Sequence, residues 1–245
     1  MTLTVGSLFS GIGGLDLGLE RAGMKVIWQS EIDPFACKVL KKHWPEVSNH
    51  GNIKQIDWRA VEPVDVVCGG YPCQPFSLAG QRKGTDDARH LWPWVRTAIS
   101  ELRPRYAVLE NVRGHLTLGG TQVIGELAEI GYDAEWRVVS AAGVGAPHKR
   151  ERIIIVAYPN NSELGYINKR GINTRTNVKG RKVFVTDSSS GRVSRANSYW
   201  LSEPGVGRVA NGIPDRVDRL RGLGNAVVPQ VAEYIGRLIT TSLDA

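Results

Sequence analysis

The sequence contains little cysteine, and this excludes two classes of protein. Its three cysteines, Cys37, Cys68 and Cys73, are too few and too odd in number for a disulfide framework. The sequence also lacks a CxxC pair or a Cys/His cluster, so it predicts no zinc or other metal site. We expect all three thiols to be reduced.

Long hydrophobic runs are absent as well. No apolar stretch approaches the roughly 18 residues that a membrane-spanning helix needs. The opening residues, MTLTVGSLFSGIGG, lack the charged and then apolar layout of a signal peptide. We therefore expect a cytoplasmic protein with no membrane partner. With 245 residues, 42% of them hydrophobic, the chain can bury a core as one large domain or one domain with a small insertion.

Acidic residues are scarce in one segment, from 159 to 209. It contains nine basic and three acidic residues, so it carries six of the seven net positive charges of the chain. The segment is rich in Asn, Ser and Gly and has one short strand-like run, KVFVTD. Such a composition favours a basic insertion that binds a polyanion, although a disordered surface loop would have a similar one.

The rest of the chain alternates between strand and helix patterns. Five β-branched runs that end in polar residues or glycine predict buried strands at 3–9, 25–31, 64–70, 106–112 and 152–158. Amphipathic stretches predict helices at 14–22, 34–43, 92–102 and 121–130, and again at 215–221 and in VPQVAEYIGRLITTSL. This alternation predicts an α/β fold with a doubly wound, mostly parallel sheet, whose ligands bind beyond the carboxyl ends of the strands. We expect residues 1–158 and 213–245 to form this domain and 159–212 to form the insertion.

A glycine-rich turn, FSGIGGLDLGLERAG, joins the first strand to the first helix. Its three glycines, Gly11, Gly13 and Gly14, would let the backbone approach a ligand at the start of the helix. Asp16 occupies the place of the third glycine in a GxGxxG fingerprint, which argues against a pyrophosphate ligand. Glu31 ends the second strand, where it could accept the hydroxyls of a ribose or cap the helix that begins at Pro34. A nucleoside cofactor without a diphosphate fits this pattern.

Four further side chains stand at the predicted strand ends. Cys73 follows the third strand between two prolines, Glu110 ends the next strand, and Arg150 and Arg152 precede or begin another. Because strand ends meet in one crevice, these residues could form a nucleophile with groups that stabilise charge. Individually, Glu110 could be a helix cap and Arg150 with Glu151 could be a surface pair.

The motifs FSGIGG, GGYPCQPFS, ENV, HKRER and LGNAVVP, in this order, resemble those of the cytosine-5 DNA methyltransferases. They cover the chain from residue 3 to about 239 apart from the basic segment. The short form of the chain resembles enzymes encoded by phages and prophages. The resemblance implies the S-adenosylmethionine-dependent methyltransferase fold, with 159–212 as a small target-recognition region. It implies methyl transfer from S-adenosylmethionine to C5 of cytosine in double-stranded DNA.

The resemblance also implies a role for each catalytic residue. Cys73 would add to C6 of a cytosine flipped out of the duplex, and Glu110 would hold or protonate N3. Arg150 and Arg152 would contact O2 and orient Cys73 and Glu110.

Further residues would bind the cofactor and the DNA. Phe9 would lie against the adenine and Glu31 would bind the ribose, and the full cofactor set is Phe9, Gly11, Gly13, Gly14, Glu31, Asn52 and Asn225. The DNA-binding candidates are Gln74, Ser77, Lys179, Arg181 and Lys182. A cognate restriction endonuclease is a further expected partner, and the sequence leaves the oligomeric state open.

The chain departs from the family pattern at two single positions, and the stretch before LGNAVVP has no clear version of the family's arginine-rich motif. His148 stands where the family has Gln, and Asn52 replaces an Asp that accepts from the adenine amino group. Three alternatives remain at this stage: a transfer RNA methyltransferase, a catalytically silent relative, and a nicotinamide-dependent oxidoreductase. The intact catalytic residues argue against the second, and the imperfect glycine fingerprint argues against the third.

Overall fold

A seven-stranded sheet forms the centre of the protein. The structure is a computed structural model, and it describes residues 2–72, 91–116, 119–160, 175–178, 181–184 and 216–243. The strand order is β3-β2-β1-β4-β5-β7-β6. The bounds are β1 Thr4–Leu8, β2 Lys25–Ser30, β3 Ser48–Asn49, β4 Val66–Gly70, β5 Tyr106–Val112, β6 Tyr132–Ser140 and β7 Glu151–Pro159.

The sheet is mostly parallel, as predicted. Parallel pairing joins β1 to β2 and β4, β2 to β3, and β4 to β5. Only β7 breaks this direction, since it runs antiparallel to β5 and to β6. The doubly wound α/β fold class is therefore confirmed, with an antiparallel hairpin at one edge.

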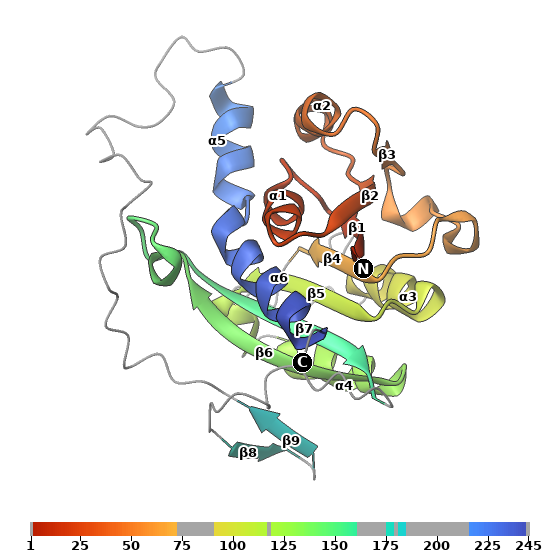
Figure 1. Cartoon of the computed structure of the whole chain (residues 1–245), viewed down its shortest axis with the longest axis vertical. Helices are drawn as coiled ribbons and strands as arrows, with labels where there is room; N and C mark the ends of the chain where they lie inside the picture. Colours follow the sequence, from red (N-terminus) through yellow and green to blue (C-terminus); the bar gives the residue numbers. More distant parts are fainter. Residues whose placement is uncertain are drawn as a thin grey trace, which may run out of the picture.

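Helices cover both faces of the sheet (Figure 1). One face packs against α1 (Gly14–Arg21) and α6 (Pro229–Leu243), and the other against α3 (Trp92–Leu102) and α4 (Gly120–Glu129). Each face has its own core, because side chains alternate along every strand: Val66 and Cys68 face α1, whereas Val67 faces α3.

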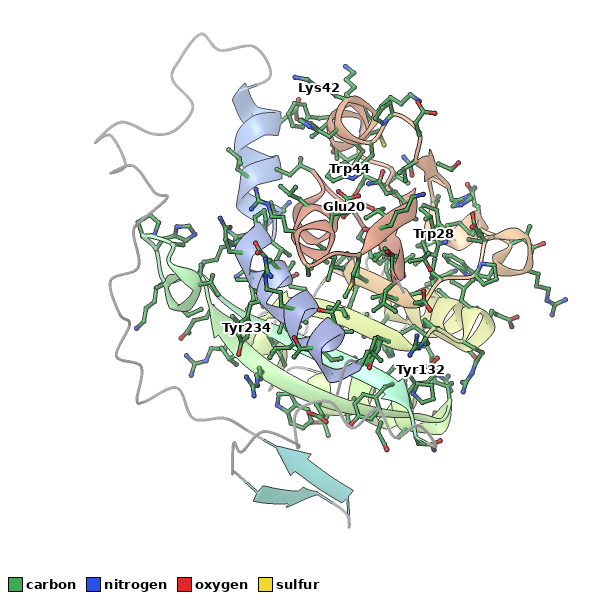
Figure 2. The ribbon with its side chains drawn as sticks, viewed as in Figure 1. Glu20, Trp28, Lys42, Trp44, Tyr132 and Tyr234 are labelled. Atoms are coloured by element: carbon green, nitrogen blue, oxygen red, sulfur yellow. The ribbon has the colours of Figure 1, made fainter. Side chains whose placement is uncertain are left out.

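The last helix returns to the first one. In Figure 1, α6 crosses the front of the sheet beside α1. A Cβ on Gly18 would lie 2.3 Å from the carbonyl oxygen of Pro229, and one on Gly236 would lie 2.6 Å from the Cβ of Ala22. Glycine at both positions therefore allows the two helices to approach closely. Tyr234 of α6 also lies over β6 (Figure 2), where Arg137 donates to its hydroxyl at 3.0 Å.

Sequence signals account for the start and end of α2 (Pro34–His43). Asp33 caps it by accepting from the backbone N–H of Ala36 at 2.9 Å, and proline occupies its first position. Its last turn carries Lys41, Lys42 and His43, which favour the negative end of the helix dipole. Asp33, rather than Glu31, is therefore the helix cap.

The described elements agree with the predicted strands and helices at most positions. The sequence patterns did not predict β3 or β6, and α5 (Arg216–Asn225) extends further than the predicted 215–221. Within the basic segment, β8 (Arg175–Val178) and β9 (Arg181–Phe184) form an antiparallel pair. None of the described helices is long and apolar enough to cross a lipid bilayer.

Candidate active site

The carboxyl ends of β1, β2, β4 and β5 surround one cavity with a volume of about 520 Å³. Its wall is completed by the first residues of α1 and α2, by α5 and by the segment that follows α5. The sequence-predicted residues that line it are Phe9, Gly11, Gly14, Glu31, Asn52, Glu110, Arg152 and Asn225. Gly13 and Arg150 lie outside this lining.

The turn after β1 has an unusual backbone. Phe9, Gly11 and Gly13 all have positive φ, at 50°, 55° and 82°. This conformation is ordinary for glycine but rare for a bulky residue, and such strain concentrates at functional sites. The turn presents Phe9 and the backbone of Gly11 to the cavity.

Gly13 does not line the cavity, and its lack of a side chain instead makes room for a neighbouring ring. It precedes α1, and a Cβ at this position would lie 2.4 Å from the ring of Trp44. Trp44 follows α2 and lies between α2 and α1 (Figure 2). The glycine therefore allows this ring to pack against the start of α1.

Glu31 is held by backbone N–H groups on both of its carboxyl oxygens. Oε2 accepts from Gly11 at 2.8 Å, and Oε1 accepts from Ile32 and Asp33 at 2.8 Å each. A carboxylate has about four acceptor sites, so three are in use and about one remains for a ligand. Glu31 thus also ties the glycine turn to the end of β2.

Asn52 lines the same cavity from the other side of β2. Its Oδ1 accepts from the backbone N–H of Lys54 at 3.1 Å and caps the short helix η1 (Ile53–Gln55). This contact occupies the side-chain carbonyl of Asn52 and leaves its amide N–H groups to donate to another partner. An amide at this position can donate to a ring nitrogen of a nucleobase, which the carboxylate of the family pattern cannot do.

The opposite end of the cavity holds a buried ion pair. Arg152 Nε donates to Glu110 Oε1 at 2.7 Å, and the two side chains are 19% and 11% exposed. Register explains the contact, because Arg152 pairs with Val112 and is therefore the diagonal neighbour of Glu110 on the same face. The glycine at the end of β4 makes room, since a Cβ on Gly70 would lie 2.8 Å from Glu110 Oε2.

Burial raises the pKa of Glu110 above its ordinary value, and the positive charges of Arg152 and Arg150 oppose that shift. The carboxyl group is therefore easier to protonate than an exposed glutamate. Such a group is better suited than an exposed glutamate to share a proton with a base placed beside it.

Arg150 has different partners. Its Nη2 donates to the carbonyl oxygens of Gly224 and Ala226 at 2.6 Å and 2.8 Å. Its Nε is buried and has no hydrogen-bond partner among the described residues. Glu151 pairs with Arg113 at 2.7 Å, so the surface pair between Arg150 and Glu151 does not form.

The predicted nucleophile, Cys73, lies just outside the described residues. The chain reaches it through Tyr71 and Pro72, which line the cavity after β4. Hydrogen bonds help to hold Tyr71: Asn111 donates to its carbonyl oxygen at 3.1 Å, and its hydroxyl lies 2.8 Å from His115 Nε2. Both partners come from β5 or the turn after it, so the start of the Cys73 segment is tied to the strand that carries Glu110.

Several DNA-binding candidates cannot be placed. Gln74, Ser77 and Lys179 lie outside the described residues, and for Arg181 and Lys182 the structure gives only their backbone in β9. Their roles stay predictions.

A buried polar network under the glycine turn was not identified from the sequence as such. Asp16 accepts from Ser7 Oγ at 2.9 Å and from Gln29 Nε2 at 2.8 Å. Burial raises the pKa of Asp16 to about 6, and the hydrogen bonds oppose the shift. This network joins α1 to β1 and β2, and its signal in the sequence is one acidic residue on the apolar face of α1.

A cavity beside a carboxyl and guanidinium pair, at the strand ends of a doubly wound sheet, is typical of the ligand site of an α/β enzyme. The family model described as C-5 cytosine-specific DNA methylase matches residues 3–200. The chain belongs to this family.

Relatives with known names support the same assignment. The chain is 41% identical over 166 residues to the type II methyltransferase M.Eco47II of Escherichia coli, a match that covers 64% of this chain and 40% of that protein. It is 32% identical over 187 residues to the type II methyltransferase M.NgoFVII of Neisseria gonorrhoeae, covering 74% and 50%. The chain thus spans about half or less of the length of these relatives.

Solved structures share the fold. The methyltransferase EhMeth of Entamoeba histolytica superposes with a TM-score of 0.66 at 17% identity, over 99% of each chain. DNMT2 of Spodoptera frugiperda gives a TM-score of 0.60 at 24% identity, covering 74% of this chain and 57% of that one. At these identities the likeness concerns the fold alone.

Proposed function

We propose that this chain transfers a methyl group from S-adenosylmethionine to C5 of cytosine in double-stranded DNA. The observation that carries the proposal is the Glu110 and Arg152 pair at one end of a cavity whose other end has the features of a nucleoside site. The family to which the chain belongs supports this chemistry.

The cavity residues fit the cofactor. Phe9 offers an aromatic face, Glu31 retains about one acceptor site for a ribose hydroxyl, and Asn52 offers amide donors to the adenine. The backbone of the glycine turn and Asn225 would line the remainder. When bound, S-adenosylmethionine supplies a methyl group on a positively charged sulfur.

The protein's own residues would activate the cytosine. The Cys73 thiolate adds to C6, and the electrons of the C5=C6 bond move toward N3 as the ring loses its aromatic character. Glu110 donates a proton to N3 and so stabilises the charge that develops there. The guanidinium of Arg152 holds Glu110 in place and can contact O2.

The final steps restore the ring. After C5 has taken the methyl group, loss of the C5 proton and departure of the Cys73 thiolate re-form the C5=C6 bond, and N3 returns its proton to Glu110. The reacting edge of a cytosine is inaccessible in a stacked duplex, so the base would be flipped into the cavity at a cost of a few kcal/mol.

We further propose that residues 1–158 and 213–245 form the catalytic domain and that 159–212 form a small recognition region. Its positive charge suits phosphate contacts. A cognate restriction endonuclease is a proposed partner, because the named relatives are type II methyltransferases.

The test is incorporation of a tritiated methyl group from S-adenosylmethionine into duplex DNA, followed by bisulfite sequencing of that DNA. We expect methylated cytosines with the wild-type chain and less than a few per cent of that incorporation with Cys73→Ala. Transfer RNA is assayed in parallel. Incorporation into transfer RNA alone, or undiminished activity of Cys73→Ala, would overturn the proposal.

A further inference from the structure

The two arginines of HKRER act on different parts of the molecule. Arg150 directly precedes β7 and Arg152 is its second residue, yet of the two only Arg152 pairs with Glu110 and only Arg152 lines the cavity. Arg150 instead donates from a single nitrogen to Gly224 and Ala226. The resemblance had implied that both arginines serve the cytosine.

The carbonyl groups that Arg150 binds lie at the end of α5. A helix leaves its last carbonyl groups without partners inside the helix, and a cation is favourable there because the helix dipole is negative at this end. Ala226 continues the turn by donating to Gly222 at 3.0 Å. The Arg150 guanidinium therefore caps α5 from outside the helix.

The capped segment is also a wall of the cofactor half of the cavity. Asn225, Ala226 and Val227 line the cavity. The carbonyl oxygen of Val227 would lie 2.4 Å from a Cβ on Gly14, so the segment lies directly against the start of α1. A displacement of this segment would therefore change the surface that faces a bound nucleoside.

We infer that Arg150 is a positioning residue for the cofactor half of the site: it holds the wall at 224–227, whereas Arg152 serves the cytosine half through Glu110. The inference rests on the proposed function, since it takes the nucleoside in the cavity to be S-adenosylmethionine. The start of β7 would then connect the two halves, because Arg150 directly precedes this strand and Arg152 lies in it. Binding in either half would influence the other reciprocally.

The experiment measures binding of S-adenosylhomocysteine by calorimetry in the absence of DNA. We expect Arg150→Met to weaken binding about 10-fold, or about 1.4 kcal/mol, because the wall loses two hydrogen bonds from a charged donor. Arg150→Lys keeps the charge at the helix end and should recover part of this loss. Arg152→Met should stay within about threefold of wild type while its methyl transfer falls.

Two controls separate this effect from a general loss of structure. Arg113→Met removes one positive charge from an exposed arginine next to the site and should leave the affinity unchanged. Hydrogen exchange should increase at residues 222–228 in Arg150→Met and not in Arg152→Met. If Arg150→Met does not fold, the same two measurements on Arg150→Lys decide.

The outcomes are distinguishable. Wild-type affinity and unchanged exchange in a folded Arg150→Met or Arg150→Lys would overturn this inference and leave the proposed function standing. Loss of methyl transfer with normal S-adenosylhomocysteine binding would assign Arg150 to the cytosine instead. A wild-type chain that does not bind S-adenosylhomocysteine would overturn the proposed function itself, together with the cofactor role of the wall.

Discussion

Replacing Gly70 by alanine would directly test the geometry of Glu110, the carboxyl group that we propose to be catalytic. A Cβ at this position would lie 2.8 Å from Glu110 Oε2, whereas ordinary contacts begin at 3.4 Å. The Glu110 carboxyl group must then move about 0.6 Å away from the added methyl group. Its hydrogen bond with Arg152, at 2.7 Å, would stretch or bend as a result.

The expected loss follows from that displacement. A misplacement of about 1 Å can reduce the rate of catalysis about 100-fold, so a shift of about 0.6 Å should reduce kcat by roughly 10- to 100-fold. A hydrogen bond to a charged group contributes about 1.5–3 kcal/mol, and partial loss of it should lower the free energy of unfolding by about 1 kcal/mol. The affinity for S-adenosylmethionine should change less than threefold, because Glu110 lies at the end of the cavity that we propose for the cytosine.

Single-turnover methyl transfer with saturating DNA and cofactor is the appropriate assay, together with urea unfolding. Gly114→Ala is the matched control, because a Cβ there would meet nothing within 4 Å and its φ is not in the left-handed region. The reasoning would be refuted by a folded Gly70→Ala whose kcat lies within twofold of wild type. An equal loss in Gly114→Ala would also refute it.

Three further predictions concern the cofactor site, the buried network and the basic segment. Glu31→Ala should weaken S-adenosylmethionine binding by about 1–3 kcal/mol in calorimetry, because a charged acceptor and the anchor of Gly11 are removed together; an unchanged affinity would remove Glu31 from the site. Burial raises the pKa of Asp16 from 3.8 to about 6, so the folded protein binds the Asp16 proton more tightly than the unfolded chain does. The free energy of unfolding should therefore fall as the pH rises from about 4 to 7. The fall is about 3 kcal/mol, and urea unfolding of Asp16→Asn should lack it; the same pH dependence in that variant would exclude Asp16 as its source. Deletion of residues 168–182 should flatten the plot of log K against log salt by about 0.9 for each phosphate that the shortened protein no longer binds, and it should change the methylated context. No change in either would assign DNA recognition elsewhere.

The sequence predicted the parallel part of the sheet well because those strands are buried on both faces. Runs such as Val64–Gly70 read as continuous apolar segments, and each is followed by an amphipathic helix. In contrast, β6 lies at the edge and carries polar residues toward α6. The Tyr158 hydroxyl donates to Glu135 at 2.7 Å, and Arg137 donates to the Tyr234 hydroxyl at 3.0 Å. The sequence around β6 does not indicate either of these partners.

The sequence could bring candidate site residues to one edge of the sheet, but it could not predict the partners that hold them. Strand ends converge by topology, so the sequence could bring Glu31 and Glu110 to one edge of the sheet. Contacts between distant residues depend on the packed structure: Tyr71 meets His115, and Arg150 meets the end of α5. Two arginines two residues apart read as equivalent in a sequence, although their partners lie 42 and 74 residues away, at Glu110 and Gly224.

The direction of β7 explains why the arginines are available at all. Because β7 runs antiparallel to β5, its first residues lie at the edge where the parallel strands end, and Arg152 pairs with Val112. A parallel β7 would bring Tyr158 and Pro159 to that edge instead. The register is equally strict, because a slip of one residue would turn Arg152 to the other face of the sheet and leave Glu110 as an unpaired buried carboxyl. The turn between β6 and β7 fixes this register through the bond from the Ala141 N–H to the Arg150 carbonyl at 3.1 Å. The antiparallel hairpin at the edge of the sheet is therefore what brings a charged pair to the cavity.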